Sequence, residues 1–338
     1  MRLIALFLAF AFALAPQANT PQGLAQEMDR IRAEAAAGTP EDQRTSPAAR
    51  LERARAALEA GRPLLALYLF EMPWESAKAW TFVQASATVA TPEAFAKKWT
   101  AMGEPRAATA GRSGRRPVLV EALASVAEAR GATTYHASRA YAEDAGVPAG
   151  FYYLGESHAV VQFAAFARSL DWPVPASAPP LRSIAAELNA LDTEMTTAYE
   201  TMDRSNHPTY IQASAALKQA KTLNDRGQYA GALFEYLLST YLFAPLRAPG
   251  VAREATAAQV ADARQALPAG VDHSIAEMFL QLAGEGTTSA VPAQRLGSGV
   301  VLDVVVPAYL RAVSQDGRST TAPVSADVTI TLVRWPFT

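Results

Sequence analysis

Residues able to do chemistry are few in this sequence, and they are scattered. The chain contains four histidines and no cysteine. The histidines are His136, His158, His207 and His273, and each is alone in its segment. A metal site on a helix needs ligands on one face, about one turn apart, and no H-x-x-x-H pattern occurs. We therefore expect no metal, no cofactor and no catalytic residue that a motif identifies.

Motifs for nucleophilic catalysis and phosphate binding are also missing from the sequence. There is no G-x-S-x-G pattern and no G-x-x-x-x-G-K-[ST] pattern. The Gly-Arg-Ser-Gly stretch at 111–114 lacks the preceding strand and following helix that a phosphate-binding loop needs. The sequence therefore favours a binding protein over an enzyme.

One carboxylate has a suggestive context. Gly155-Glu156-Ser157 falls in a long apolar run that predicts a helix over residues 151–170. The Glu-Ser pair resembles that of the catalytic helix of the lytic transglycosylases, whose glutamate protonates a glycosidic oxygen from an apolar cleft. The Gly-Leu-x-Gln segment that follows in that family is missing here, because the chain continues AVVQFAAFARSLDWPVPASAPP. We expect Glu156 to face solvent or to pair along its own helix.

Aromatic residues gather in two segments of the chain. They are Tyr68, Phe70, Trp74, Trp80 and Phe82 in the first segment, and Phe151, Tyr152 and Tyr153 in the second. Such rings form sugar platforms and protein-binding surfaces, but at helical spacing they more often belong to the core. We expect core positions for most of them and keep surface binding as the alternative.

The elements that position these residues are predicted to be helices. Alanine, the best helix former, is spread along the whole chain, and runs of β-branched residues are scarce before the C-terminal region. We expect Pro47 to open a helix, Pro73 to bend or restart one, and Gly131 to end one. Residues 101–117 are rich in Gly, Ser, Arg and Pro, which predicts a loop or linker.

The C-terminal region has a different pattern. Residues 284–298 lack apolar periodicity and are predicted to be loop-like. Apolar and polar residues alternate over 326–335, which predicts a strand. Residues 300–306 fit either a strand or a helix broken at Pro307, and pairing them with 326–335 is the economical choice.

Two segments share a spacing of small and aromatic residues. The matching positions are Ala220, Leu223, Gly227, Tyr229, Ala232, Tyr236 and Ser239 within 216–245, and Ala54, Gly61, Pro63, Ala66 and Phe70 within 50–73. This spacing resembles the tetratricopeptide repeat, which implies stacked antiparallel helical hairpins. The family's leading Trp and Leu-Gly are missing, and no regular period follows. We expect an irregular, α-solenoid-like stack of hairpins with a short C-terminal β segment.

The start of the chain predicts export. Met1-Arg2 precedes an apolar run over 3–15, which is typical of a signal peptide ending near residue 18. Ala15 and Ala18 are the two candidate cleavage positions. We expect a periplasmic or secreted protein with no membrane span after cleavage. The absence of cysteine argues against a lipoprotein, and 30 basic against 32 acidic residues argue against nucleic acid as a partner.

The expected organisation follows from these features. It comprises the signal peptide over 1–18, helical hairpins over 19–100, a linker over 101–117, a helical repeat-like region over 118–283 and a C-terminal loop and β segment over 284–338. The leading hypothesis is a non-enzymatic scaffold that binds a protein or peptide in the cell envelope. The alternative is a protein that binds or cleaves cell-wall glycan with Glu156 and the aromatic clusters. A helical accessory protein without a separable site is a third possibility.

Overall fold

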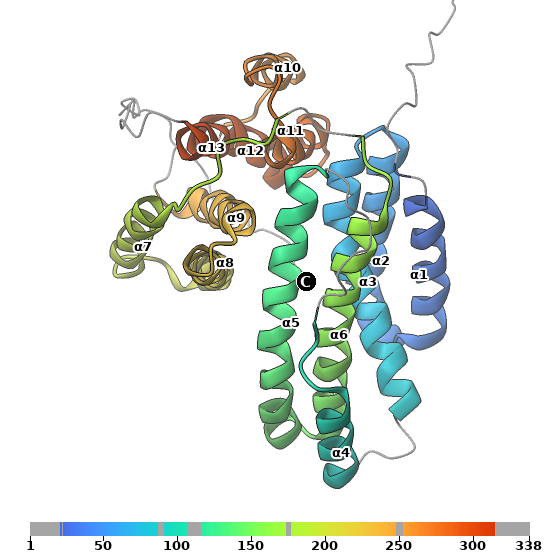
Figure 1. Cartoon of the computed structure of the whole chain (residues 1–338). Helices are drawn as coiled ribbons and strands as arrows, with labels where there is room; N and C mark the ends of the chain where they lie inside the picture. Colours follow the sequence, from blue (N-terminus) through green and yellow to red (C-terminus); the bar gives the residue numbers. More distant parts are fainter. Residues whose placement is uncertain are drawn as a thin grey trace, which may run out of the picture.

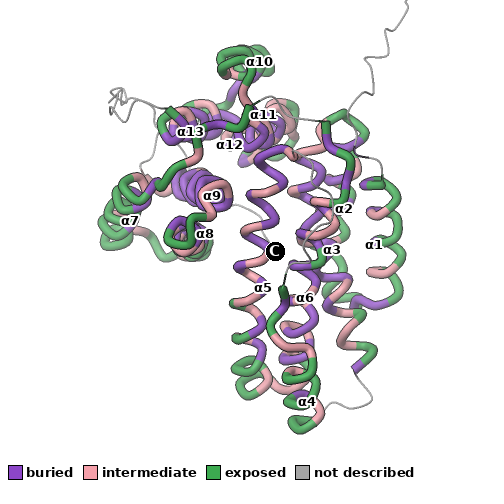
Figure 2. Tube along the Cα trace, in the orientation of Figure 1, coloured by how far each residue is buried: buried purple, intermediate pink, exposed green. Residues whose placement is uncertain are grey.

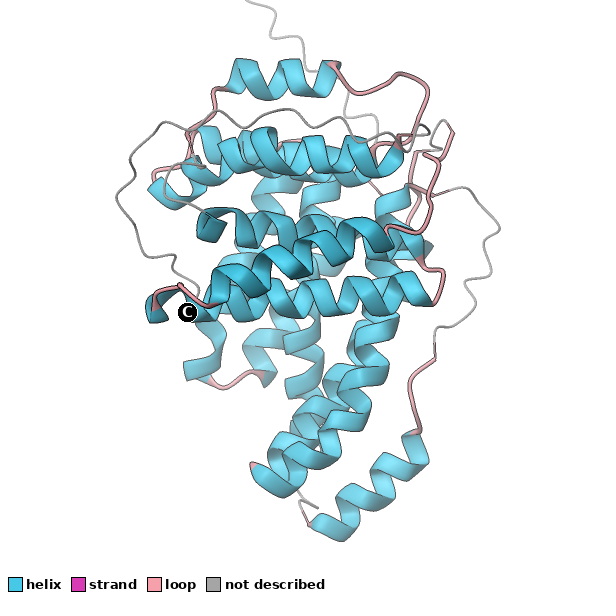
Figure 3. Ribbon diagram, turned by 90° about the vertical axis from the view of Figure 1, so that its left-hand side faces the viewer, coloured by secondary structure: helices cyan, strands magenta, loops and turns pink. Residues whose placement is uncertain are grey.

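The structure is a computed structural model of the chain. It describes residues 21, 23–86, 91–106, 116–173, 177–247 and 253–314. These residues are 81% helical and form no sheet, which confirms the prediction of a mostly α fold (Figure 3). The predicted signal peptide over 1–18 and the predicted strand over 326–335 lie outside the described residues.

The first part of the chain forms a layer of long helices that lie side by side (Figure 1). They are α1 (Leu24–Gly38), α2 (Glu41–Glu59), α3 (Pro63–Ser86), α5 (Val118–Asp144) and α6 (Val147–Ser169). Helices α1 and α2 pack on α3, which packs on α6, and α6 packs on α5. The short helix α4 (Pro92–Met102) packs against α6 at one end of this layer.

The second part of the chain packs against one side and one end of that layer (Figure 1). Its elements are α7 (Ala185–Tyr199), η2 (Arg204–Asn206), α8 (His207–Asp225), α9 (Tyr229–Arg247), α10 (Ala257–Gln265), α11 (Ser274–Thr287), α12 (Pro292–Val300), η3 (Val301–Val305) and α13 (Val306–Val313). Helix α9 lies against α5, and α11 contacts both α3 and α5. Figure 2 shows that α9 is almost wholly buried, whereas α7 and α10 expose much of their surface.

Helix α11 joins the two parts through hydrogen bonds that span long stretches of sequence. The first amides of α5 are capped from the start of α11, since Val118 N donates to Asp272 Oδ2 at 2.7 Å and Leu119 N to Ser274 Oγ at 2.9 Å. Further along, Leu65 N of α3 donates to Gln281 Oε1 at 3.0 Å. Free amides at a helix start are satisfied in this way by side-chain oxygens.

Both predicted hairpins are present, and their two turns have the same geometry. Gly61 and Gly227 have φ values of 71° and 73°, which glycine adopts without strain. In each turn the amide after the glycine donates a hydrogen bond to the carbonyl five residues earlier. These bonds run from Arg62 N to Ala57 O and from Gln228 N to Leu223 O, both at 2.9 Å. This is the Schellman pattern of helix ends. Helix pairing is therefore confirmed, because α2 packs on α3 and α8 packs on α9.

The predicted break at Gly131 is wrong, because α5 runs unbroken through this residue. A Cβ atom at position 131 would lie 2.6 Å from Val161 Cγ2 and 2.8 Å from the Ser157 carbonyl oxygen. Gly131 therefore serves the close approach of α5 to α6 rather than the end of a helix.

Pro47 does not open a helix, because it lies inside α2, which begins at Glu41. Pro73 does not restart one, because it lies inside the continuous helix α3. Proline has no amide to donate to the carbonyl four residues before it. For Pro73 that carbonyl belongs to Leu69, and Arg50 Nε of α2 donates to it instead, at 3.2 Å. A neighbouring helix thus supplies the missing donor.

The C-terminal predictions require correction as well. Residues 284–298 are mostly helical, because α11 continues to Thr287 and α12 begins at Pro292. Residues 300–306 are helical rather than a strand, and Val301–Val305 form a π turn in which Val306 N donates to Val301 O. The wider turn accommodates Pro307, whose ring would collide with the regular α-helical carbonyl.

By length and composition, one helical segment of the described chain, Pro292–Val313, could cross a membrane. Its mean hydropathy reaches 1.5, and 56% of its apolar window is buried inside the protein. A core helix meets the same criteria, and the burial agrees with that role.

Candidate functional site

Four glutamates from three helices surround one arginine. Arg130 of α5 forms ion pairs with Glu71 and Glu75 of α3, and its Nη2 lies 3.1 Å from Glu71 Oε1. Glu156 of α6 and Glu235 of α9 are close enough to interact electrostatically with the same guanidinium. We call these five residues the Arg130 cluster.

Small residues on α6 explain why α3 and α5 lie close to this helix near Glu156. A Cβ atom at Gly155 would lie 2.8 Å from Phe82 Cβ of α3. On the other side of Glu156, Ser157 is fully buried, and its carbonyl oxygen faces Gly131 of α5. The residues flanking Glu156 therefore let α3 and α5 approach α6 closely, and Glu156 comes near charges on both.

The glutamates of α3 and α9 in the cluster are buried, and the Arg130 side chain is partly exposed although its Nε is buried. Glu71, Glu75 and Glu235 are 7%, 5% and 7% exposed, respectively. The Arg130 side chain is 39% exposed. Glu156 and Glu235 form no hydrogen bond or ion pair within the described part of the chain, whereas Arg130 pairs with the other two glutamates.

The surroundings favour protonated carboxyl groups. Burial raises the pKa of Glu75, and nearby Glu71 and Glu156 raise it further against the opposing effect of Arg130. Burial also raises the pKa of Glu156, which Arg130 again opposes. Burial and the Glu71 carboxylate raise the pKa of Glu235 to about 8, although Arg130 lowers it. Carboxyl groups that hold a proton near neutral pH can donate it or exchange it for another cation.

For the pKa of Arg130, the nearby charges outweigh burial. Burial lowers the pKa of its guanidinium, but the carboxylates, led by Glu75, raise it by more. Arg130 therefore stays charged and serves as the positive centre of the cluster.

A row of aromatic rings begins beside Glu156. Burial raises the pKa of the Tyr152 hydroxyl, and the Glu156 carboxylate adds to that effect. The ring centroid of Tyr152 lies 5.0 Å from Trp80 and 5.4 Å from Tyr153. Tyr153 stacks at 3.8 Å on Tyr141, which is 40% exposed. The rings thus lead from the carboxylates toward the protein surface.

Other aromatics of the two sequence clusters belong to the core. Phe70, Trp74 and Phe151 are 0%, 5% and 2% exposed. The Trp74 Nε1–H donates to the Ala159 carbonyl at 3.1 Å, and the ring stacks on Phe166 with centroids 5.0 Å apart. The expectation that these rings are core residues is confirmed for these three.

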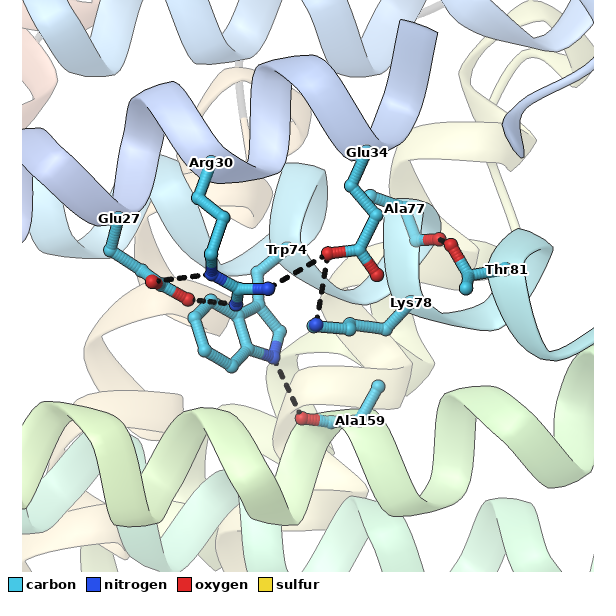
Figure 4. Close-up of polar contacts among 8 residues, drawn as sticks. All are labelled: Glu27, Arg30, Glu34, Trp74, Ala77, Lys78, Thr81 and Ala159. Carbon is cyan, nitrogen blue, oxygen red and sulfur yellow. Dashed lines mark hydrogen bonds and ion pairs between the residues drawn. The ribbon is translucent and has the colours of Figure 1, made fainter. Parts of the chain in front are cut away.

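Charged groups of α1 and α3 cover Trp74 (Figure 4). The Arg30 guanidinium and the Lys78 ammonium each lie 5.6 Å from the centre of its ring. Glu34 accepts hydrogen bonds from both, at 3.0 Å and 2.9 Å. This arrangement fastens α1 to α3, so Trp74 is not available as a ligand platform.

A second feature is the surface formed by α7 and α8, where two large apolar side chains are exposed. Tyr199 is 51% exposed and Ile211 is 65% exposed. The Tyr199 ring lies 5.0 Å from Tyr210 and 5.5 Å from His207. A pocket of about 260 Å³ adjoins these rings, lined by Asp192, Met195, Tyr210, Ser214, Leu217, Lys218 and Lys221. We call this region the α7–α8 surface.

The histidines are dispersed over the structure. His136 Nε2 lies 3.1 Å from a Glu104 oxygen at an exposed position, and His158 packs near Tyr135. His273 Nδ1 lies 2.7 Å from the hydroxyl of Tyr309. Among the residues that the structure describes, no group of three or more His, Cys, Asp or Glu side chains is arranged to hold a metal ion.

Comparisons with known proteins give no family for this architecture. No protein-family model, curated protein or solved structure matches the chain. The paired helices therefore stand without assignment to the tetratricopeptide repeat family or to any other.

Glu156 is half-buried, and the charges near it are Arg130 and Glu75 on neighbouring helices. Arg130 and the other glutamates were missed from sequence. The available signal was a carboxylate inside an apolar run, as in Glu71 and Glu75 of LYLFEMPWE and Glu235 of ALFEYLL. A charge placed in such a run must find a partner once the helix is buried.

Proposed function

We propose that this protein is an exported helical scaffold that binds a protein or peptide partner through the α7–α8 surface. The exposure of Tyr199 and Ile211 beside a pocket is the observation that supports the proposal. Tyrosine is enriched among the residues that dominate binding energy, and exposed apolar side chains that gather in one place are typical of interaction sites.

The pocket suggests how a partner would be held. Its floor includes the apolar side chains Met195 and Leu217, which are 2% and 3% exposed. Lys218 and Lys221 line its rim, and Lys221 Nζ lies 2.8 Å from Asp192 Oδ2. A partner would insert an apolar side chain between α7 and α8 and place polar groups against these charges.

The experiment is a pull-down from cell-envelope extract with quantitative identification of the captured proteins. The baits are the wild-type protein, Ile211→Asp and Tyr199→Ala. We expect a partner whose recovery falls at least about tenfold with either substitution, as for residues central to an interface. Val291→Asp is the matched control, because Val291 is an exposed apolar residue at 37% exposure outside this surface. Identical capture by all baits would refute the proposal.

A second candidate function is binding or cleavage of cell-wall glycan. The supporting observation is the position of Glu156, with its raised pKa, beside the aromatic row that ends at Tyr141. A buried carboxylic acid next to sugar-stacking rings has the elements of a general acid for glycoside hydrolysis.

Purified peptidoglycan tests this second candidate. Release of soluble fragments by the wild-type protein but not by Glu156→Gln would support cleavage. Cosedimentation that is lost with Tyr141→Ala would support binding alone. Neither release nor cosedimentation would remove the glycan hypothesis and leave the scaffold proposal intact.

A further inference from the structure

We propose that the partner of the α7–α8 surface is an acidic amphipathic helix, which lies along the groove between α7 and α8 with a carboxylate at Lys218. The proposal names the chemistry of the partner and therefore rests on the scaffold proposal. It predicts two apolar residues about one turn apart on the partner helix, followed by an aspartate or glutamate after about one more turn.

The groove between α7 and α8 already accepts a helix on its inner side. Helix α9 contacts both α7 and α8. The hydroxyl of Ser239 on α9 donates to the Ala213 carbonyl of α8 at 2.8 Å and lies 3.8 Å from the sulfur of Met195 on α7. Met195 also lines the pocket, whose other lining residues belong to α7 and α8 and none to α9. The pocket therefore opens on the side of the helix pair that α9 leaves uncovered.

The pocket has room for one side chain of a larger partner. Its volume is about 260 Å³, which is below the range of about 300–1,000 Å³ that is usual for small-molecule sites. Met195 and Leu217 form an apolar floor, and Tyr199 and Ile211 extend the apolar surface beyond the pocket. A partner must therefore insert one apolar side chain and cover further apolar surface beside it.

The spacing along α8 favours a helical partner. Ile211, Ser214 and Lys218 are separated by three and four residues, so they share one face of α8. Ile211 and Lys218 are seven residues apart, which is about 10 Å along the helix axis. A partner helix places residues at matching intervals on one of its own faces. An extended peptide spans this distance in about three residues, and the side chains at its two ends point to opposite sides.

The charges of the pocket favour an acid on the partner. Two lysines and one aspartate line it, and Lys221 is the lysine that pairs with Asp192, at 2.8 Å. Lys218 is exposed and forms no ion pair with any described residue. The Ser214 hydroxyl likewise forms no hydrogen bond in the described part of the chain. The rim thus has an excess of positive charge and free donors, which a carboxylate complements.

The experiment is fluorescence anisotropy of the full chain with dye-labelled peptides of about 15 residues, a length at which alanine-rich peptides form helix in water. The first probe has two leucines four residues apart and a glutamate three residues later, with alanine and glutamine elsewhere. We expect saturable binding of this probe. A second probe with lysine in place of the glutamate should bind at least about fivefold more weakly, because attraction at Lys218 becomes repulsion.

Reversing the charge on the protein completes the comparison. Lys218→Glu should bind the glutamate probe at least about fivefold more weakly than the wild type does, and it should bind the lysine probe more tightly. Lys218 is exposed, so the substitution should leave the fold intact. Lys97→Glu is the matched control, because Lys97 is an exposed lysine of α4 that has no ion pair among the described residues. It should bind both probes like the wild type.

A third probe tests the helical form of the partner. It carries a proline in place of an alanine between the two leucines and keeps the leucines and the glutamate. Proline in a helix interior costs about 3 kcal/mol, so this probe should bind at least about tenfold more weakly than the first. Equal binding of the two would show that the site takes an extended peptide, and it would overturn the inference.

Two results with the unsubstituted protein also overturn the inference. One is the absence of saturable binding of the glutamate probe, or equal binding of the glutamate and lysine probes. The other is a dimer in light scattering that Ile211→Asp converts to monomers, because this result assigns the surface to a second copy of the chain.

The pull-down separates this inference from the scaffold proposal when Lys218→Glu is added as a bait. A partner that is lost with Ile211→Asp and with Lys218→Glu supports both. A partner that is lost with Ile211→Asp but captured equally by Lys218→Glu overturns the acidic helix and leaves the scaffold proposal standing. Identical capture by all baits refutes the scaffold proposal itself.

Discussion

Helices α5 and α6 hold two clusters built from the same residue types, and their charges are balanced differently. In one, Arg168 Nε donates to Glu121 Oε2 at 3.0 Å, and Arg168 also pairs with Glu128. Arg116 Nη1 lies 3.5 Å from Glu121 Oε1. We call this the Arg168 cluster, in which two guanidiniums meet two carboxylates. The Arg130 cluster sets four carboxylates around one guanidinium.

The difference separates a balanced network of ion pairs from a cluster that has more carboxylates than cations. Every carboxylate of the Arg168 cluster has a guanidinium partner, and the group joins α5 to α6. Within the Arg130 cluster, Glu156 and Glu235 have no such partner and lie near Arg130 without pairing to it. The number of charges around a half-buried arginine thus says more about the role of its cluster than the presence of the arginine does.

The largest expected effect comes from removing each central arginine. Arg130→Met leaves Glu71 and Glu75 buried and unpaired, so the free energy of unfolding should fall by about 3 kcal/mol. Arg168→Met should cost about 1 kcal/mol, because the Glu121 side chain is 40% exposed and can be hydrated. Urea denaturation of both variants measures the two losses. Equal losses would erase the distinction between the clusters.

The next effect is a pH dependence that originates in the Arg130 cluster. The pKa of Glu235 is about 8 in the folded protein and about 4.3 in an unfolded chain. The folded state therefore binds more protons in between, and stability should fall as the pH rises from about 5 to about 8, by about 3–4 kcal/mol.

Urea denaturation at several pH values measures this slope in the wild type and in Glu235→Gln. The variant cannot ionise at this position, so its stability should fall less over the same range. A wild-type slope that persists unchanged in Glu235→Gln would place its origin elsewhere.

A smaller effect is expected where the two helices meet. Gly131→Ala improves the helix propensity by about 1 kcal/mol, but its new methyl group collides with Val161 and the Ser157 carbonyl of α6. We expect a net loss of about 1–2 kcal/mol in thermal or chemical unfolding. Gly284→Ala is the control, because nothing lies within 4 Å of its added Cβ, and it should stabilise α11. If both variants are stabilised, the close approach does not exist.

The smallest effect concerns charges that lie nearer the surface. Lys78→Ala removes an ion pair to Glu34 and a contact with the Trp74 ring, and it should cost about 0.5–1 kcal/mol. Lys97→Ala, at an exposed position of α4, should change the stability by less than about 0.5 kcal/mol. A loss at Lys78 as large as that of Arg130→Met would contradict the ranking of the clusters by burial.

Features of the fold that depend on local chemistry were predictable from the sequence. Gly61 and Gly227 end helices because the Schellman turn needs a residue with positive φ, and this requirement is visible in the sequence. Gly131 and Pro73 looked like similar signals, but partners from other helices determine their roles. The valines of 300–306 have β-branched side chains that suit a strand, yet burial against other helices retains them in a helix.

The candidate site was predictable only in part. Glu156 could be singled out, because a carboxylate in an apolar run is unusual. Its neighbours Arg130, Glu75 and Glu235 belong to three other helices, and no periodicity in the sequence specifies which helices become adjacent. The exposed pair Tyr199 and Ile211 was missed for the same reason, since exposure depends on which face of a helix remains uncovered.

The cap that α11 provides for α5 has a consequence for the order of folding during synthesis. Asp272 and Ser274 lie 154 and 155 positions after the amides that they cap. Helix α5 therefore leaves the ribosome long before its first turn can be capped, and this helix at the edge of the layer depends on chain that is made later. Closure of the molecule from its C-terminal side is thus a late step, and it stabilises helices that were made early.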